Sequence, residues 1–402
     1  MNVLLLCGYY EAQFETMLAG CSKSAMEHAA NLFQKKLITG LRSQPCSLRV
    51  VSAPFIGSWP NRSAIRSFRG FPVPSREGIV YVPFHNLWGW RSFSRARALE
   101  KPIDDFIKET HGTRRALIVY APHTPFLEAA VRAKRKAPDL RICLIVPDLP
   151  QYMNLSEKPH RFYDFCKRID IWYLLRLNRQ VDCYWLLTKT MTELFPTGSK
   201  PALILEGIAV PTEMLVPARR SKTFVYAGKL LRRFGVQRLL DAFALLEDPD
   251  CRLVICGAGE MQSTVQEAAE KDARIHHAGV LTPSELHRLY RTSGVLVNPR
   301  TSVEAYTRYS FPSKILEYLQ TGLPVVSARL DGMPAIYDRL LFQPENDTAE
   351  ALCQAMTAAM NANPSEEAKR LNAVQNHLRS LAPSAVASRL LALLFPCEEK
   401  HP

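Results

Sequence analysis

The sequence has no cysteine pattern typical of a disulfide framework or of a metal site. It contains 10 cysteines in 402 residues, yet no two of them form a Cys-x-x-Cys pair. Cys7, Cys143, Cys183 and Cys256 lie in apolar, strand-like runs, where a free thiol behaves as a small hydrophobic side chain. This usage argues against a disulfide-rich secreted domain and predicts a reducing, cytoplasmic compartment.

The sequence also has no long apolar run, no leader-like segment and no low-complexity tract. None of its hydrophobic stretches approaches the roughly 18 residues of a membrane span, and the first residues lack the basic leader of a signal peptide. We therefore expect a cytoplasmic protein that is at most peripheral on the inner face of the plasma membrane. Hydrophobic residues still make up 47% of the chain, and the formal net charge of +13 indicates an anionic partner or substrate.

Short apolar runs alternate with helix-like segments along the chain, which predicts an α/β fold with parallel sheets. The runs of the first half lie at 3–7, 48–52, 79–82, 116–120, 142–146 and 183–187. The alternation restarts at 223 after a stretch that contains Pro211 and Pro217. We predict an N-terminal domain at 1–211, a linker at 212–221, a C-terminal domain at 222–378 and a final helical segment at 379–402.

A helix between two buried strand-like runs provides the first candidate site. Ser310 and Pro312 suit its first turn, and Ser313, Lys314 and Glu317 share one face because residues three and four apart are neighbours. A helix start with a hydroxyl and an ammonium can bind an anion, and a carboxylate one turn further on can accept hydrogen bonds from a sugar diol. The pattern is typical of a nucleoside diphosphate site, and an exposed ion pair next to a serine cap is the alternative.

Glycine-rich turns follow two strand-like runs of the second half. Gly228-Lys229 leads on to Arg232-Arg233 and Gly235, which suits a loop near phosphate oxygens; a tight turn with solvated cations is the alternative. Gly257-Ala258-Gly259 follows the next run, but a dinucleotide fingerprint fails because Gln262 stands where the third glycine is needed.

Two polar residues of the first half follow strand-like runs, at the end where α/β sheets bind their ligands. His123 comes after the run at 116–120 and is a candidate functional group, with a plain loop or helix-capping histidine as the alternative. Asp148 comes after the run at 142–146 and lies between two prolines. A turn or N-cap role is the alternative for Asp148.

Residues 59–101 interleave arginines with aromatic residues. They include Arg62, Arg66, Phe68, Arg69, Phe71, Arg76, Trp88, Trp90, Arg91, Phe93, Arg95 and Arg97. Basic residues with aromatic neighbours suit single-stranded nucleic acid or an anionic bilayer interface. A solvated loop is the alternative.

In their order along the chain, these motifs resemble those of a known enzyme family. Gly228-Lys229, Arg233-Phe234-Gly235, Gly257-Ala258-Gly259, Gly279-Val280 and Ser313-Lys314-x-x-Glu317-Tyr318 are similar to motifs of GT-B-fold, family 4-type retaining glycosyltransferases. The similarity is greatest to bacterial capsule and exopolysaccharide members. The resemblance implies two facing Rossmann-like domains, with a C-terminal helix that crosses back to the first.

The resemblance also implies a donor site that holds a nucleoside-diphosphate sugar. Its residues would be Gly8, Lys229, Arg233, Val280, Ser310, Ser313, Lys314 and Glu317. The cations and Ser313 would contact the diphosphate, Val280 the nucleobase and Glu317 the ribose. We expect a UDP-sugar rather than a GDP-sugar.

For catalysis, the resemblance places His123 beside the donor sugar, and we add Asp148 and Glu304 as catalytic candidates. The family's first glutamate lies eight positions before the ribose-binding one, where this chain has Tyr309. Either Glu304 serves that role through a longer loop, or Tyr309 occupies the place and the role is lost. We expect no metal, no D-x-D-type site and no cofactor beyond the co-substrate, because helix termini and cations can neutralise the leaving diphosphate.

The sequence therefore predicts transfer of a sugar, with retention of configuration, to a hydroxyl of a glycan or lipid-linked acceptor in surface polysaccharide synthesis. An anionic membrane surface is a further expected partner, and nucleic acid is not. The alternatives are a degenerate protein that binds sugar nucleotides without catalysis, and a basic nucleic-acid-binding protein.

Overall fold

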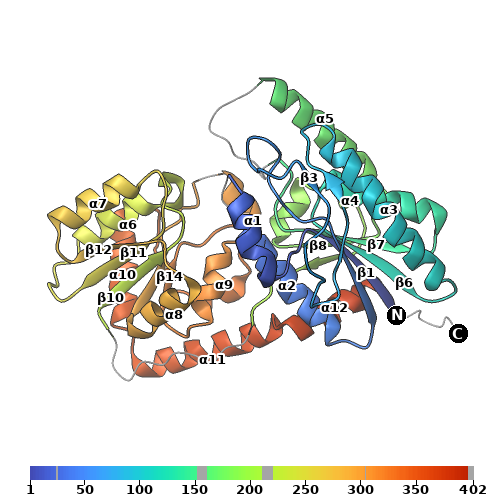
Figure 1. Cartoon of the computed structure of the whole chain (residues 1–402). Coiled ribbons are helices and arrows are strands. Elements are labelled where there is room, and N and C mark those ends of the chain that lie inside the picture. Colours follow the sequence, from blue (N-terminus) through green and yellow to red (C-terminus); the bar gives the residue numbers. More distant parts are fainter. Residues whose placement is uncertain (24–25, 152–160, 211–220, 304, 397–402) are drawn as a thin grey trace, which may run out of the picture. The chain divides into compact units, whose positions relative to one another are not determined.

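The chain folds into two compact units, each built on its own sheet. The computed structural model describes residues 1–23, 26–151, 161–210, 221–303 and 305–396. The first unit comprises Met1–Ile208 with Pro383–Pro402, and the second comprises Ala209–Ala382. Most of the predicted linker at 212–221, and Glu304, lie outside the described residues. Figure 1 shows the α/β architecture of each unit.

The first unit has a seven-stranded sheet in the order β4-β2-β1-β6-β7-β8-β9, and all of its pairings are parallel. Its strands are β1 Asn2–Cys7, β2 Ser47–Ser52, β4 Val80–Tyr81, β6 Arg115–Tyr120, β7 Arg141–Val146, β8 Cys183–Leu186 and β9 Ala202–Ile204. The central strands are buried on both faces, which explains their nearly continuous apolar sequences.

Helices cover both faces of this sheet. They are α1 Glu15–Cys21, α2 His28–Arg42, α3 Arg91–Glu109, α4 Thr124–Lys136, α5 Arg161–Asn178 and α12 Pro383–Leu394, with short 3-10 turns η1 Ala12–Phe14 and η2 Lys189–Glu193. α12 packs against α2, and α3, α4 and α5 pack side by side, as Figure 1 shows. The chain's last helix is thus part of the first unit, where Gln44 Nε2 donates a hydrogen bond to the Ser384 carbonyl at 3.1 Å.

A small antiparallel ribbon lies outside the main sheet of the first unit. Its strands are β3 Ser67–Phe68 and β5 Phe84–His85, with Ser67 opposite His85 and Phe68 opposite Phe84. The sequence predicted neither strand, because two-residue strands carry no periodic signal. Both come from the arginine- and aromatic-rich segment.

The second unit has a five-stranded sheet in the order β12-β11-β10-β13-β14, also parallel throughout. Its strands are β10 Thr223–Ala227, β11 Arg252–Cys256, β12 Ile275–Gly279, β13 Val295–Asn298 and β14 Val325–Ser327. Its helices are α6 Val236–Ala244, α7 Gln262–Lys271, α8 Pro283–Thr292, α9 Ser313–Leu319, α10 Ala349–Met360 and α11 Pro364–Ser380, with 3-10 turns η3 Arg232–Phe234, η4 Ala305–Tyr309 and η5 Ala335–Arg339.

The core of the second unit joins α6 and α10 to the sheet. Leu239 and Phe243 of α6 pack with Leu352 and Met356 of α10 in one buried cluster that includes Phe224 of β10. Burial of this much apolar surface is the main stabilising contribution to such a unit. The predicted α/β fold class is therefore confirmed in both units. Among the described residues, no helix combines the length and the apolar character needed to span a bilayer.

Candidate functional site

Three neighbouring strands of the second unit, β10, β11 and β12, end at the same edge of the sheet, and hydrogen bonds join the residues at these ends. Gly228, after β10, donates its N–H to the Cys256 carbonyl of β11 at 3.0 Å, and Leu230 donates to Ala258 at 3.0 Å. Gly257, after β11, donates to Gly279 at the end of β12 at 2.7 Å. The two glycine turns found in the sequence therefore form one continuous backbone surface.

Glycine is required at 257 for this packing. Its φ is +133°, and a Cβ added there would lie only 1.8 Å from the Gly228 carbonyl oxygen. A side chain at this position would push the two turns apart, and L residues rarely adopt such a φ. The glycines that were considered as a dinucleotide fingerprint therefore allow two loops to pack in contact.

Tyr318 of α9 fixes that helix to the end of β10. Its hydroxyl accepts a hydrogen bond from the Ala227 N–H at 2.9 Å and donates one to the Ala227 carbonyl at 3.3 Å. The ring is fully buried, and burial raises the pKa of Tyr318 well above its ordinary value, so the hydroxyl stays protonated. This anchor places the other residues of α9 beside the glycine turns.

Lys314 and Glu317 of α9 form an ion pair at this edge. Lys314 Nζ lies 2.9 and 2.8 Å from the two carboxylate oxygens of Glu317, and the Tyr290 hydroxyl donates to the same carboxylate at 3.2 Å. The side chains are 36% and 41% exposed, so the pair contributes little to stability. Burial raises the pKa of Cys256 to about 11 and the charge of Lys314 opposes this rise, which puts Lys314 near the end of β11.

The start of α9 differs from the predicted cap. The helix begins at Ser313 with Pro312 as its N-cap, so the prediction that Ser310 and Pro312 lie in its first turn is wrong. No side chain caps the helix, which removes the alternative of a serine cap. Pro312 has extended backbone dihedrals, which carry Ser310 away from the first turn. Ser310 Oγ is buried and has no hydrogen-bond partner among the residues that the structure describes, while Ser313 is exposed.

The remaining donor-site candidates of the second unit lie on its turns. Lys229 is exposed and forms no ion pair within the described residues, and its carbonyl accepts a hydrogen bond from the Tyr226 hydroxyl at 2.8 Å. The guanidiniums of Arg233 and Arg300 lie 5.6 and 4.4 Å from the ring centre of Phe234. Together with Lys314, these residues supply several cations to one edge.

Val280 follows β12 directly and is 77% exposed. An apolar side chain this exposed at the carboxyl edge of a sheet is a ready surface for a flat apolar ligand group. The sequence motifs predicted Val280 as a donor-site residue. In the structure, Val280 lies beside the Gly257 turn, because Gly257 donates its N–H to the carbonyl of the adjacent Gly279.

The loop after β13 leads to the unsettled pair Glu304 and Tyr309. Ser302 is held by Asp347, whose carboxylate accepts hydrogen bonds from the Ser302 N–H at 2.9 Å and hydroxyl at 2.7 Å. The buried Arg238 lies 3.4 Å from the same carboxylate group. Tyr309 ends η4, and Glu304 lies outside the described residues, so the choice between them stays a prediction. Sequence reasoning did not find Asp347 or Arg238.

In the first unit, Gly8 and His123 come together around one aromatic ring. A Cβ on Gly8 would lie 2.2 Å from the ring of Phe55, and the same ring has its centre 4.8 Å from that of His123. Gly8 donates its N–H to Gln34 Oε1 at 2.8 Å. Because β1 and β6 are neighbours in the sheet, their following residues meet at the carboxyl edge.

His123 is kept neutral by its surroundings. Burial, followed by the charges of Arg95 and Arg91, lowers the pKa of His123 from 6.5 to about 3. Its backbone is the N-cap of α4, but its side chain caps nothing, which removes the alternative of a helix-capping imidazole. The imidazole can therefore exchange hydrogen bonds with a neutral group near pH 7, but it is not a proton-carrying acid there.

Arg91 and Arg95 of α3 were assigned by the sequence to an exposed basic segment. Arg95 is instead buried, with Nη2 donating to the Pro54 carbonyl at 2.7 Å and the guanidinium 4.2 Å from the ring centre of Phe84. Arg91 Nη1 donates to the Ile56 carbonyl at 3.3 Å. Both residues thus hold the loop that carries Phe55, a role with no signal in the sequence.

Asp148 follows β7 and is exposed. Burial, followed by the charge of Asp148, raises the pKa of Tyr120, which ends β6, so Asp148 lies near that strand end. A buried carboxylate that sequence reasoning missed is Glu11, which accepts hydrogen bonds from the N–H groups of Arg76 and Glu77 at 2.8 and 3.0 Å.

One Asp-x-Asp stretch, Asp248-Pro249-Asp250, does occur in the sequence. It immediately precedes β11 and lies at the amino end of that strand, away from the glycine turns. Lys222 Nζ lies 2.7 Å from the Asp248 carboxylate and 3.3 Å from that of Asp250. No group of three His, Cys, Asp or Glu side chains among the described residues is placed to hold a metal. The absence of a metal requirement stays a prediction.

Part of the sequence is similar to known proteins. Residues 221–362 match the model of the family described as Glycosyl transferases group 1. A curated relative, D-inositol 3-phosphate glycosyltransferase of Corynebacterium efficiens, is 33% identical over 133 residues. This match covers 30% of the chain and 30% of the relative, so it spans less than a third of that protein.

Solved structures match the chain over nearly its whole length. A lipopolysaccharide outer core galactosyltransferase, WaaB, has a TM-score of 0.62 at 14% identity and covers 98% of this chain and 99% of its own. The Anabaena protein HepE in complex with UDP has a TM-score of 0.60 at 13% identity, with 98% and 99% covered. The second unit therefore matches a glycosyltransferase family model, and the expected GT-B fold is confirmed over nearly the whole chain. The expected similarity to retaining enzymes and to capsule and exopolysaccharide members stays a prediction.

Proposed function

We propose that the protein transfers a sugar from a UDP-sugar to an acceptor hydroxyl with retention of anomeric configuration. The observation that carries this proposal is the Tyr318 anchor, which sets Lys314 and Glu317 beside the glycine turns that bear Lys229. Cations and close backbone at one sheet edge suit a diphosphate, and a carboxylate beside them suits a ribose. The bound UDP of HepE supports uridine as the base.

In this proposal, each residue has one task. Lys229, Arg233 and Lys314 neutralise the charge that develops on the leaving diphosphate, which is the largest contribution such a site makes to rate. Glu317 exchanges part of its contact with Lys314 for the ribose hydroxyls when the donor binds, and the exposed Val280 covers the base. Neutral His123 of the first unit holds a hydroxyl of the donor sugar.

The acceptor is proposed to be a glycan or a lipid-linked saccharide in surface polysaccharide synthesis. WaaB, named for the lipopolysaccharide outer core, supports this class of acceptor. The first unit also carries an unusual apolar stripe on α5, where Phe165, Ile169 and Trp172 are 60%, 50% and 61% exposed. Their spacing puts them on one face of the helix.

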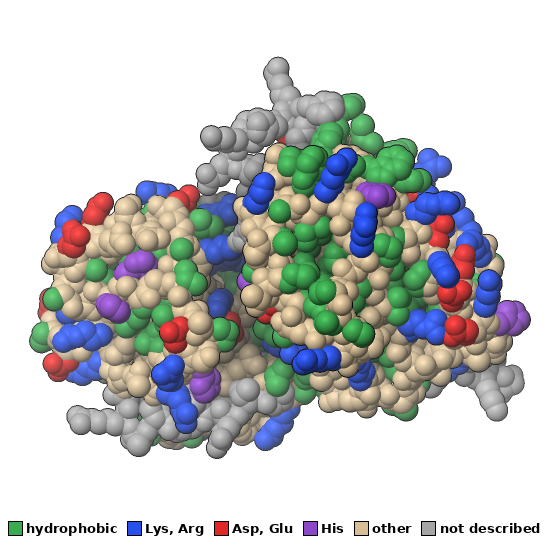
Figure 2. All heavy atoms as spheres, viewed as in Figure 1, with side chains coloured by type: hydrophobic (Ala, Val, Ile, Leu, Met, Phe, Trp, Pro, Cys, Tyr) green, Lys and Arg blue, Asp and Glu red, His purple; other side chains and the backbone are tan. Residues whose placement is uncertain are grey.

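Arginines flank this stripe. Arg168 is exposed, and the guanidinium of Arg176 lies 5.9 Å from the ring centre of Trp172. Figure 2 shows hydrophobic and basic side chains gathered over the part of the first unit where α5 and the β3–β5 ribbon lie in Figure 1. Aromatic and basic side chains together are typical of proteins that bind an anionic bilayer surface, so we propose a peripheral location on the membrane.

Calorimetric titration with UDP and GDP tests the donor site. We expect UDP to bind, and Glu317→Gln to weaken UDP by roughly tenfold, the usual cost of one charged hydrogen bond. The same variant leaves the affinity for 2′,3′-dideoxy-UDP unchanged, because that ligand has no ribose diol. Equal losses for both ligands would exclude Glu317 from ribose binding.

NMR of the product tests retention of configuration. We expect the product to keep the donor's anomeric configuration, and an inverted product would contradict the proposal.

Sedimentation with vesicles tests the membrane surface. We expect the protein to bind vesicles containing phosphatidylglycerol and the triple change Phe165→Ser, Ile169→Ser and Trp172→Ser to weaken binding by about tenfold or more, since each buried apolar side chain contributes about 1.5–3 kcal/mol. Leu32→Ser, at another exposed apolar residue of the first unit, is the control. Undiminished binding by the triple variant would contradict the assignment of α5.

A further inference from the structure

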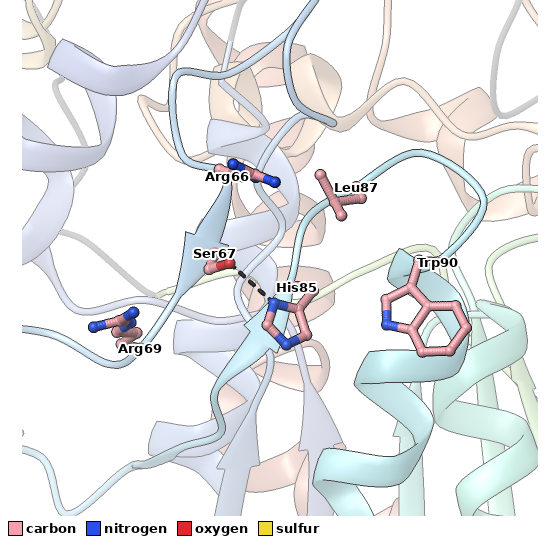
Figure 3. A pocket seen from close by; sticks show the side chains of 6 residues that line it. All are labelled: Arg66, Ser67, Arg69, His85, Leu87 and Trp90. Carbon is pink, nitrogen blue, oxygen red and sulfur yellow. Dashed lines mark hydrogen bonds between the residues drawn. The ribbon is translucent and has the colours of Figure 1, made fainter.

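A pocket of about 560 Å³ opens beside the β3–β5 ribbon of the first unit. It is lined by Arg66, Ser67, Arg69, His85, Leu87 and Trp90, which Figure 3 shows on the ribbon and on the segment that leads into α3. The volume falls in the range of about 300–1,000 Å³ that is usual for small-molecule sites. None of these residues belongs to the candidate donor or catalytic sets.

The floor of the pocket is firmly held. Buried Asn86 donates from Nδ2 to the carbonyls of Gly57 at 2.7 Å and Ile65 at 2.9 Å, and its N–H donates to the Arg66 carbonyl at 2.9 Å. Phe68 and Phe84 pack beneath the ribbon with ring centres 5.4 Å apart. Such a floor fixes the position of the residues above it before any ligand arrives.

The polar groups of the pocket are suited to an anion. Neither Arg66 nor Arg69 forms an ion pair with a carboxylate in the described part of the chain, and both side chains are exposed. Ser67 Oγ and His85 Nδ1 share a hydrogen bond of 3.0 Å, drawn in Figure 3, which leaves His85 Nε2 for another partner. Guanidinium groups are the preferred partners of phosphate because their donors match its oxygens in pairs.

An aromatic wall stands beside these cations. Trp90 is 52% exposed, and its ring centre lies 4.9 Å from that of Phe93, itself 46% exposed. A flat apolar face beside cationic donors accommodates the carbon skeleton that carries a phosphoryl group. The guanidinium of Arg66 also lies 5.6 Å from the ring centre of Trp59, which orients it at the rim.

We propose that this pocket binds a phosphoryl group of the acceptor, with Arg66 and Arg69 contacting its oxygens and Trp90 packing against the attached sugar or lipid. Only the identification of the ligand as the acceptor rests on the proposed function. The phosphoryl site itself is a property of the first unit. Acceptors of this chemistry are either soluble sugar phosphates or lipids with a phosphate headgroup, and both present the same group to the pocket.

The test uses the full chain saturated with UDP, so that the phosphate-binding edge of the second unit is occupied. Glucose 6-phosphate, with glucose as the uncharged reference, is titrated into the protein and into Arg66→Gln/Arg69→Gln. The control is Arg62→Gln/Arg76→Gln, which removes the same charge from exposed arginines of the same segment outside the pocket. We expect the pocket variant to lose roughly tenfold or more in affinity and the control less than about threefold.

A second arm uses vesicles containing phosphatidylglycerol, with phosphatidylcholine vesicles as reference. If the wild type binds glucose 6-phosphate and this binding needs Arg66 and Arg69, the source is a soluble phosphate. If the wild type does not respond to glucose 6-phosphate but its vesicle binding needs Arg66 and Arg69, the source is a lipid headgroup. If both double variants behave alike in both arms, the pocket does not read phosphate and the inference is overturned. The preceding UDP titration reports on the donor site separately, so failure there leaves this comparison intact.

Discussion

The carboxyl edges of the two sheets are built in different ways. In the second unit, glycine turns pack backbone against backbone, and Lys229 and Lys314 lie at the surface beside them. In the first unit, Arg95 is buried under the loop that carries Phe55, and its charge helps keep His123 neutral. The second edge is therefore suited to neutralise a charged ligand, and the first to hold a neutral hydrogen-bonding group in place.

The largest effect that separates the two edges is expected at Gly257. In Gly257→Ala, the new Cβ meets the Gly228 carbonyl at 1.8 Å and the φ of +133° is strained. We expect a loss of about 3 kcal/mol or more in stability of the second unit, together with loss of UDP binding. Denaturant unfolding and calorimetry measure the two.

Gly112→Ala is the matched control, because Gly112 also has positive φ, at +74°, but nothing within 4 Å of a Cβ. It belongs to the first unit and should cost only about 1 kcal/mol, with no change in UDP affinity. Equal losses in both variants would show that strain alone, rather than loop packing, explains the glycine.

A smaller effect is expected from pH at the first edge. The pKa of His123 falls to about 3 in the folded protein, against 6.5 when unperturbed. Between pH 3 and pH 6.5, His123 is therefore protonated in the unfolded chain but neutral in the folded chain. The stability contributed by neutral His123 is lost as pH falls below about 6.5. The slope is at most about 1.4 kcal/mol per pH unit, and less because the side chain keeps some solvent contact.

Comparison of the free energy of unfolding of wild type and His123→Phe at pH 7 and pH 5 isolates this contribution. The wild type should lose more stability than the variant between the two values, because Phe cannot titrate. His28→Phe is the control, since His28 is exposed beside Glu15. A difference between wild type and His123→Phe that does not change with pH would show that His123 is freely protonated in the folded protein.

The sequence predicted the sheets well because their signal is local. The two strand-like runs that precede the glycine-rich turns of the second half are observed as β10 and β11, since buried parallel strands are continuously apolar. Local pattern also found Lys314 and Glu317 as an i,i+3 pair. It did not establish that the pair belongs to a site, because the Tyr318 hydroxyl reaches Ala227 from 91 positions away.

The parts that sequence analysis missed depend on tertiary packing. Arg95 reads as one more exposed cation in a basic segment, and only the stacking on Phe84 and the bond to Pro54 show that it is buried. Ser310 reads as a helix cap, but the extended Pro312 starts the helix later. The pocket of Arg66 and Trp90 is lined from two places, because Arg66 directly precedes β3 and Trp90 directly precedes α3, and no periodicity of the sequence encodes that juxtaposition.

The most direct test of the central claim is the affinity for UDP of Lys229→Ala/Lys314→Ala. Lys222→Ala/Lys271→Ala is the control, because it removes the same charge from exposed lysines away from the glycine turns. We predict a loss of about 100-fold or more in the first variant, as two charge-assisted contacts to phosphate disappear, and less than about threefold in the control. UDP affinity that is equal in the two variants would contradict the assignment of this edge as the donor site.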